Sequence, residues 1–189
     1  MSGFNHFNFI GPIYDRIFGR SKNQDIVAFA QVNQTHHLLD VGGGTGRVSK
    51  LFESRVKGIQ IADPAPKMLL EAQIKGLRTV VAQSERLPYP NGAFDRVIMV
   101  DALHHVADQQ KTLDEMWRLL APGGKIVIEE PDINHFLVKL IALGEKVLLM
   151  RSHFLKPERV AAMCRFDPSA KIEINRKKGI ACVIITRQK

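Results

Sequence analysis

Apolar runs and amphipathic segments alternate along the first two thirds of the chain. Short apolar runs at residues 37–41 ("HLLDV") and 58–63 ("GIQIAD") are typical of buried strands. After each of them, apolar residues recur every three or four positions, at 48–56 and 65–76, and this spacing is typical of helices with one buried face. Regular alternation of strands and helices favours an α/β fold.

The alternation continues through three more strands and one longer helix. The strands are expected at 78–83 ("RTVVAQ"), 94–102 ("FDRVIMVDA") and 125–130 ("KIVIEE"), and the helix spans about 108–120, where "PGG" ends it. Five strands joined by right-handed helical crossovers form a parallel sheet.

The last third of the chain has a different pattern. Helical spacing covers 136–150, a short helix begins at Pro157, and two strand-like runs at 171–179 and 180–189 are joined by a tight "RKKG" link, typical of an antiparallel hairpin. The expected architecture is a mostly parallel seven-stranded sheet with a reversed strand at its C-terminal edge and helices on both faces. Ligands bind such sheets at the carboxyl ends of the parallel strands.

Length and composition are those of one soluble domain, with 189 residues of which 45% are hydrophobic and 24% charged. Cys164 and Cys182 lie far apart without metal-ligand spacing, which argues against a disulfide framework or a metal site and fits a reducing cytoplasm. The N-terminus lacks the pattern of an export signal. The apolar segment 136–150 contains charges and is too short to cross about 30 Å of hydrocarbon, so a cytoplasmic protein is expected.

Positive charge is concentrated in the last third. Residues 1–138 carry 15 Lys and Arg against 15 Asp and Glu, whereas residues 139–189 carry 12 against 4 and supply the net charge of +8. Such a region favours contact with phosphate-bearing lipid, nucleic acid or an acidic substrate, and an ordinary solvated surface explains it equally well. No aromatic residues interleave with the basic run at 176–178, which counts against single-stranded nucleic acid.

A glycine-rich stretch, "LLDVGGGTG" at residues 38–46, joins the first strand to the next segment. Gly42, Gly44 and Gly46 form a G-x-G-x-G spacing. The dinucleotide fingerprint would need a glycine where Arg47 stands, and a P-loop would need Lys followed by Ser or Thr. Backbone without side chains lets a ligand approach closely, and N–H groups at a helix start can receive its carboxylate.

Here the chain resembles the class I S-adenosylmethionine-dependent methyltransferases, whose first motif is close to residues 38–46. The resemblance continues in order through "IADPAPKMLLEA", "AQSERLPYPNGAFDRVIMVDALHHV" and "LLAPGGKIVIEEP", up to residue 131. It is greatest to the ubiquinone and menaquinone methyltransferases of methyltransferase domain type 11 and to the phospholipid methyltransferases. It implies one Rossmann-like domain, with 1–34 as an arm over the cofactor, 36–131 as the cofactor-binding core and 132–189 on the acceptor side.

The resemblance implies that the core binds S-adenosylmethionine and releases S-adenosylhomocysteine. Asp40 is expected near the ammonium or sulfonium, and Asp63 is expected to accept hydrogen bonds from both ribose hydroxyls, because a carboxylate offers two acceptor oxygens. The alternative for Asp63 is a cap on the helix that follows it. The expected cofactor-binding residues are Tyr14, Asp40, Gly42, Gly44, Gly46, Asp63, Pro64, Met68, Gln83, Ser84 and Asp101.

Three of these assignments have alternatives. Relatives usually carry an acid that bonds the adenine amine after the third strand, whereas this chain has Gln83 followed by Ser84. Either the Gln83 carbonyl oxygen accepts from the amine, or the contact shifts to the Ser84 backbone. Met68 either lies under the adenine or ribose or packs in the core. Tyr14 resembles the tyrosine of a "YD" pair that reaches the cofactor carboxylate in many relatives, and core packing is its alternative.

His104 and His105, in "DALHHV" after the fourth strand, are the candidate catalytic residues. Methyl transfer from a sulfonium is an in-line displacement that depends on holding the acceptor near the methyl group in a water-poor pocket. A histidine base would remove a proton from an enolic or hydroxyl acceptor near neutral pH. Adjacent residues rarely face the same pocket, so at least one of the pair is expected to be structural.

The expected function is methyl transfer to a small lipophilic acceptor, such as a quinone precursor or a lipid-like molecule. The acceptor would be bound by the arm and by residues 132–167, which are apolar, with the basic C-terminal third contacting a membrane surface. One alternative is methylation of RNA or protein, in which the basic third binds phosphates. Another is a cofactor-binding module without catalysis, which the departure at Gln83 permits.

Overall fold

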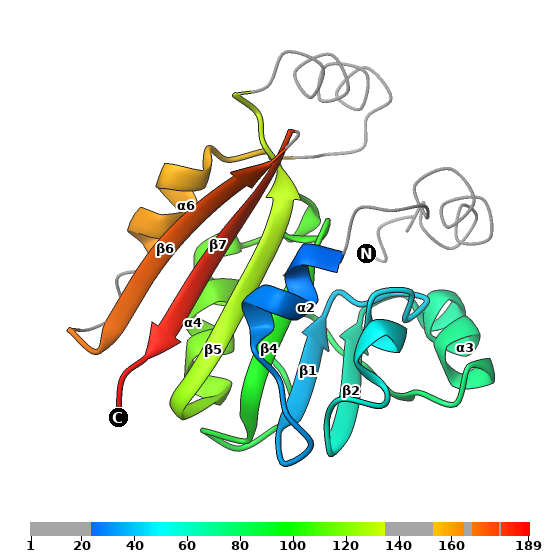
Figure 1. The fold of residues 1–189 in the computed structure, drawn as a ribbon. Helices are drawn as coiled ribbons and strands as arrows, with labels where there is room; N and C mark the ends of the chain where they lie inside the picture. Colours follow the sequence, from blue (N-terminus) through cyan, green and yellow to red (C-terminus); the bar gives the residue numbers. More distant parts are fainter. Residues whose placement is uncertain (1–23, 135–152, 165–167, 178) are drawn as a thin grey trace.

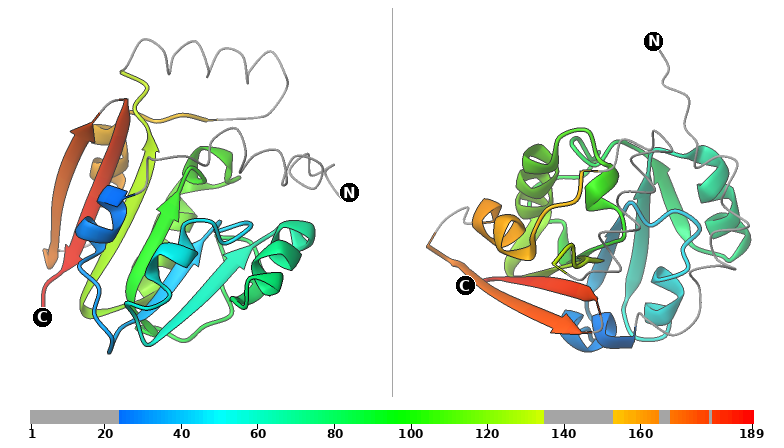
Figure 2. Two further views of the ribbon diagram at one scale, coloured as in Figure 1. Left: turned by 45° about the vertical axis from the view of Figure 1, so that its right-hand side comes forward. Right: turned by 90° about the horizontal axis from the view of Figure 1, so that it is seen from above.

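A seven-stranded sheet runs through the part of the chain that the computed structural model describes, which comprises residues 24–134, 153–164, 168–177 and 179–189. The strands follow one another in space in the order β3-β2-β1-β4-β5-β7-β6, and the sheet has the twist usual for such folds (Figures 1 and 2). Their bounds are β1 His37–Val41, β2 Gly58–Asp63, β3 Arg78–Val81, β4 Phe94–Val100, β5 Leu120–Pro131, β6 Ala170–Lys177 and β7 Ile180–Arg187.

The strand directions confirm the expected fold. Strands β3, β2, β1, β4 and β5 are parallel neighbours, and β7 is antiparallel both to β5 and to β6, with which it forms the predicted hairpin (Figure 1). The reversed strand β7 lies between β5 and β6, so the hairpin completes the C-terminal side of the sheet.

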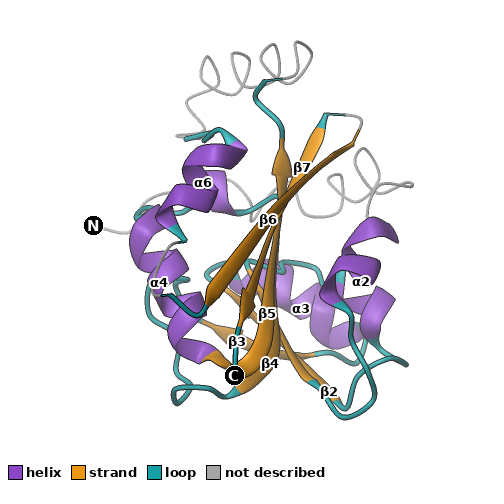
Figure 3. Cartoon of the chain, turned by 60° about the vertical axis from the view of Figure 1, so that its left-hand side comes forward, coloured by secondary structure: helices purple, strands orange, loops and turns teal. Residues whose placement is uncertain are grey.

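Helices cover both faces of the sheet, as expected (Figure 3). Helices α4 (Gln109–Leu119) and α6 (Pro157–Met163) pack on one face, and α2 (Gln24–Ala30) and α3 (Pro66–Ile74) pack on the other. A short 3₁₀ turn, η2 (Leu103–His105), follows β4.

The helix expected across 48–56 is instead one short 3₁₀ helix, η1 (Ser49–Phe52). Its hydrogen bonds join residues three apart, as from the Leu51 N–H to the Val48 carbonyl at 3.0 Å. The buried Ser49 hydroxyl donates to Asp40 at 2.6 Å, which ties the start of the segment to β1. The apolar spacing therefore predicted two buried residues, Val48 and Phe52, but not the 40% exposed Leu51 or the type of helix.

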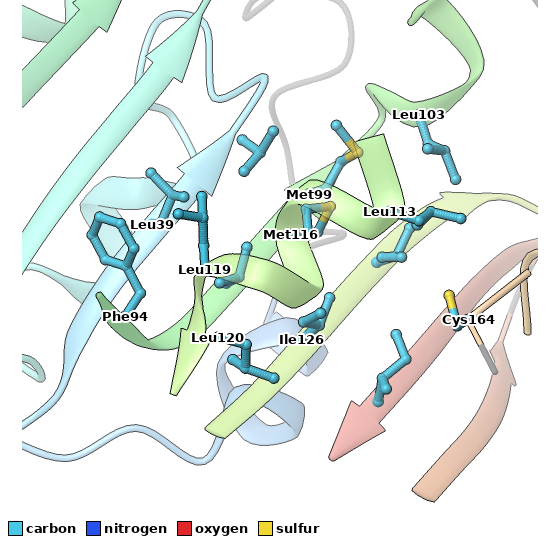
Figure 4. Close-up of a cluster of buried hydrophobic side chains, with 14 of the residues drawn as sticks. Leu39, Phe94, Met99, Leu103, Leu113, Met116, Leu119, Leu120, Ile126 and Cys164 are labelled. Atoms are coloured by element: carbon cyan, nitrogen blue, oxygen red, sulfur yellow. The ribbon is translucent and has the colours of Figure 1, made fainter. Parts of the chain in front are cut away.

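The larger core lies between α4 and the sheet (Figure 4). Met116 and Leu119 are fully buried and pack against strand residues such as Met99, which alternates along β4 with residues facing the opposite core. Asp108 caps the start of α4 by accepting a hydrogen bond from the Lys111 N–H at 3.0 Å. Burial of each large side chain contributes about 1.5–3 kcal/mol, which fixes α4 on the sheet.

The strand order places a topological switch point beside β1. The chain proceeds from β1 outward to β2 and β3, and then returns to place β4 on the other side of β1. The loops after β1 and β4 therefore leave the same edge of the sheet in diverging directions, which opens a crevice between them.

No helix of the described residues is long and apolar enough to cross a membrane. Both cysteines are buried thiols. The helix expected at 136–150 and all of the expected N-terminal arm before residue 24 lie outside the described residues.

Two glycines with similar backbone conformation are expected to differ in their tolerance of a side chain. Gly46 has φ +74°, and a Cβ atom there would lie 2.4 Å from Leu77 Cδ1, whereas Gly76 has φ +81° and nothing within 4 Å of a Cβ atom. Gly76→Ala should reduce the free energy of unfolding by about 1 kcal/mol, and Gly46→Ala by about 1–3 kcal/mol more, because only the second also overpacks the core. Urea unfolding of both variants checks this, and equal losses would contradict it.

Candidate functional site

A cavity of about 310 Å³ opens at the carboxyl ends of β1, β2 and β4, at the switch point of the sheet. Its volume is within the range of small-molecule binding sites. The loop after β1, the end of β2 and the loop after β4 form its walls.

The loop after β1 brings bare backbone to the cavity. Gly42 and Gly44 line it with φ of +71° and +51°, a region that other residues enter only with strain. A Cβ atom on Gly42 would lie 2.7 Å from the Ala102 Cβ, and one on Gly44 would lie 2.9 Å from the Met68 Cε. Glycine is therefore required where this loop meets the opposite wall. Gly46, in contrast, packs under Leu77 and is not part of the lining.

Asp40, at the start of the glycine loop, is a buried carboxyl group in the cavity floor. Its pKa is raised to about 7, mainly by burial and also by the nearby Asp63, although the Ser49 hydrogen bond and Arg47 act in the opposite direction. Near neutral pH, a cation bound in the cavity would therefore favour the ionised form of the Asp40 carboxyl group.

Asp63, at the end of β2, joins two walls of the cavity. One of its carboxylate oxygens accepts from the Gly44 N–H at 3.0 Å, and the other accepts from the Ala65 N–H at 2.8 Å, immediately before α3. Burial raises the pKa of Asp63, and these two hydrogen bonds lower it. The alternative of a helix cap is not borne out, because the N-cap of α3 is Ala65 and no side chain caps this helix. Each carboxylate oxygen can still accept a second hydrogen bond from a ligand.

The wall formed by the segments after β2 and after β3 combines exposed and anchored residues. Pro64, Met68 and Gln83 line the cavity, and Met68 is only partly buried, so it is not a plain core residue. The Ser84 hydroxyl lies 3.1 Å from the Thr112 hydroxyl, which anchors this wall to α4. Glu85 accepts hydrogen bonds from the backbone N–H groups of residues 107 and 108 at 3.1 and 3.0 Å, and so closes the far end of the cavity.

An ion pair spans the cavity at the switch point. The Arg47 guanidinium nitrogen lies 3.9 Å from an Asp101 carboxylate oxygen, and both side chains line the cavity. Asp101 has φ +51°, although it is not a glycine, and its N–H donates to the Glu129 carbonyl at 2.9 Å. A cation and an anion a short distance apart can receive the carboxylate and ammonium groups of a free amino acid.

The two histidines face different surroundings. His105 lines the cavity, whereas His104 is buried behind it, its Nδ1 bonded to a Glu130 carboxylate oxygen. Burial, together with the neighbouring His104, lowers the pKa of His105 to about 3. His105 is therefore a neutral imidazole at physiological pH.

Most predicted site residues meet in this cavity. Asp40, Gly42, Gly44, Asp63 and His105 line it, together with Pro64, Met68, Gln83, Ser84 and Asp101. Of the others, Gly46 and His104 lie outside the lining, and Tyr14 lies outside the described residues.

Sequence reasoning missed three charged residues, Arg47, Glu85 and Glu130. Arg47 was considered only as the residue that breaks other glycine motifs, and Glu85 was overlooked beside Gln83. The signal for Glu130 was a pair of acids at the end of an apolar strand, where a buried charge requires a partner. Across the described ranges, no group of three or more His, Cys, Asp or Glu side chains is arranged to hold a metal ion.

Comparison with known proteins identifies the kind of site. Residues 39–128 match the profile of the Methyltransferase domain family. A demethylmenaquinone methyltransferase of Thermus thermophilus is 34% identical over 139 residues, which cover 66% of this chain and 63% of the relative. The matched region is thus less than two thirds of that relative's length.

Solved structures of similar fold include two methyltransferases. A chain of the complex between the Haloferax volcanii Trm112 methyltransferase activator and the putative methyltransferase matches with a TM-score of 0.84 and 16% identity, and the match covers 100% of both chains. Phosphoethanolamine N-methyltransferase 2 of Haemonchus contortus, in complex with S-adenosyl-L-methionine, matches with a TM-score of 0.79 and 16% identity, over 93% of this chain and 56% of that one.

The fold is that of class I S-adenosylmethionine-dependent methyltransferases, and residues 39–128 match the Methyltransferase domain family. The residues present fit the family's cofactor, because the glycine loop leaves room that a Cβ atom would fill and buried carboxyl groups face the cavity.

Removal of the Asp63 carboxylate should weaken binding of S-adenosylmethionine by about 1.5–3 kcal/mol, because it removes charged acceptors and releases the Gly44 N–H. Isothermal titration calorimetry of Asp63→Ala measures the loss. Asp95→Ala is a matched control, because Asp95 accepts from the His37 N–H at the opposite edge of the sheet and should leave the affinity unchanged. An unchanged affinity in Asp63→Ala would remove its assigned role.

Binding of the cationic cofactor should depend on the ionisation of Asp40. A cation favours the charged carboxylate and so lowers the pKa of Asp40 from about 7, which releases a proton on binding and strengthens affinity as the pH rises from about 5 to 7. Calorimetry in buffers of different ionisation enthalpy counts the proton. Asp40→Asn should lose the part of the pH dependence and proton release that comes from Asp40. Any titration of the ligand itself is the same in both proteins. Identical pH profiles for the variant and the wild-type chain would therefore refute the assignment.

Proposed function

We propose that the chain is an S-adenosylmethionine-dependent methyltransferase that acts on a small lipophilic acceptor, such as a quinone precursor or a lipid-like molecule. The observation that carries the proposal is the cavity at the switch point, in which Asp40, the glycine loop and Asp63 meet. The cofactor supplies an electrophilic methyl group on a sulfonium, and the residues of this chain bind and orient it.

The ionisable groups divide the cavity into two ends. Asp40 and the Arg47–Asp101 pair offer charged partners for the amino-acid end of the cofactor. Asp63 offers acceptor oxygens to the ribose, and Gln83 offers an amide to the adenine beside the wall anchored by Ser84. Held at both ends, the cofactor would present its methyl group between them, where His105 and Ala102 line the cavity.

His105 contacts the acceptor as a hydrogen-bonding group in this proposal. Because the pKa of His105 is about 3, the ring is a weak base and is poorly suited to removing a proton from the acceptor near neutral pH. A neutral imidazole can instead donate or accept one hydrogen bond and orient an acceptor that is already electron-rich, such as an enolic or phenolic ring. His104 supports this wall from behind.

The surroundings favour a small acceptor over a polyanion. In the described C-terminal part, Arg176 pairs with Asp132 at 3.2 Å and with Glu158, and Lys177 pairs with Asp25 at 2.8 Å. These basic side chains are therefore partly neutralised within the molecule. Demethylmenaquinone methyltransferase is the name of a relative at 34% identity, which supports a quinone-type acceptor. Contact of the basic third with a membrane surface remains a prediction.

Transfer of a labelled methyl group from S-adenosylmethionine tests the proposal. With pools of quinone precursors, lipids, RNA and protein offered separately, label is expected in the quinone or lipid pool. His105→Asn should reduce the turnover number about tenfold or more, equivalent to at least about 1.4 kcal/mol, with little change in cofactor affinity. Ile74→Ser, at a side chain that is 81% exposed on α3, is the unaffected control.

The outcomes separate the three candidate functions. Label in RNA or protein, with binding that falls steeply with salt, would favour a macromolecular acceptor and overturn the proposed substrate class. Binding of S-adenosylmethionine without transfer to any pool would favour the non-catalytic module.

A further inference from the structure

Glu130, near the end of β5, makes more contacts with the cavity wall than any role in the sheet requires. One carboxylate oxygen accepts from the N–H groups of Ala102 and Leu103 at 2.9 and 2.8 Å. The other oxygen is bonded to Nδ1 of His104. Both oxygens of one strand residue are thus committed to the three-residue segment that follows Asp101 and precedes His105.

The ring of His104 is held from several sides. It stacks on Phe154 with ring centroids 4.2 Å apart and lies 3.9 Å from the ring of His105. Its backbone carbonyl accepts from the His153 N–H at 2.7 Å. Its side chain is only 5% exposed and that of Glu130 only 13% exposed, so water competes weakly for their hydrogen bond.

The proton in this pair has a defined position. If Glu130 accepts in this contact, Nδ1 of His104 carries the hydrogen, because a ring nitrogen donates only when it is protonated. The same contact therefore fixes both the orientation of the His104 ring and the nitrogen that is protonated. His105 is in ring contact with His104, so the orientation of the His104 ring bears directly on the residue that lines the cavity.

We propose that Glu130 is a positioning residue of the methyl-transfer site, which sets the place of His105 in the cavity wall by fixing residues 102–104 and the ring of His104. The proposal rests on the proposed function in one respect, namely that His105 faces the acceptor. Glu130 itself lies outside the cavity lining and acts through His104. Placing the Glu130 carboxylate largely out of water would be costly without hydrogen-bond partners. Its bonds to the loop after β4 offset that cost and hold this cavity wall in place.

The proton position can be measured in the protein as it stands. Nitrogen-15 spectra of the histidine rings in the wild-type chain should show hydrogen on Nδ1 of His104, with a proton resonance shifted far downfield by the bond to Glu130. A His104 ring protonated only on Nε2 would overturn the proposal. This measurement needs no variant and no methyl acceptor.

Glu130→Gln tests the position of the His104 proton separately from the hydrogen bonds that Glu130 accepts from the backbone of residues 102 and 103. The amide oxygen can still accept from residues 102 and 103, but the amide nitrogen presents a donor to His104 and should move its proton to Nε2. The His105 signals should shift with it, whereas the affinity for S-adenosylmethionine should change little, because His105 faces the acceptor and not the cofactor in the proposed function. The matched control is Glu129→Gln, because Glu129 is the adjacent buried acid of β5 and accepts a hydrogen bond from the Cys182 thiol. It should leave the His104 proton, the His105 signals and the affinity unchanged.

Each result decides the matter. If Glu130→Gln leaves the histidine spectra unchanged, or if Glu129→Gln alters them equally, Glu130 is not a positioning residue. If Glu130→Gln does not fold, the wild-type spectrum still decides where the proton lies. If the wild-type chain does not bind S-adenosylmethionine, the proposed function fails, whereas the histidine spectra of the variants still test whether Glu130 positions His105.

Discussion

The hydrogen bond from the Gly44 N–H to the Asp63 carboxylate is the contact on which the rest of the site depends. It ties the loop after β1 to the end of β2, two segments that parallel pairing already brings side by side. Asp63 also reaches the start of α3 through Ala65, so three segments are fixed by one carboxylate. At Gly44 itself the backbone has φ +51°, and a Cβ atom would lie 2.9 Å from the Met68 Cε. A cofactor crevice follows from this geometry before any ligand enters.

Sheet topology extends this local arrangement to the second wall. Since β1 pairs with β4 as well as with β2, the loop that carries Asp101 and His105 emerges opposite the glycine loop. The apolar core under α4 holds β4 and β5 in place, and Glu130 at the end of β5 then fixes the loop after β4. Each wall is thus supported by an acid on the neighbouring strand, Asp63 on β2 and Glu130 on β5.

Local patterns in the sequence predicted the fold and the cavity wall formed by the glycine loop and the end of β2. Strand positions, their parallel order and the hairpin follow from hydrophobic periodicity and turn chemistry, and the glycine spacing located the crevice. The second wall depends on contacts between residues far apart in the chain. Glu130 meets His104 across 26 positions, and no periodicity reports such a pair. The pattern also could not decide between an α-helix and a 3₁₀ helix after the glycines, because the same apolar spacing fits either type of helix over one turn.

The left-handed backbone of Asp101 has a consequence for how this protein can change. A non-glycine residue in that conformation costs about 1–3 kcal/mol, and the surrounding structure must supply the difference. Replacement by glycine or asparagine would relieve the strain and make a sturdier fold, yet it would also remove the charge that faces Arg47. Selection for thermal robustness alone would therefore tend to erode this position, so the aspartate is held there at the expense of stability.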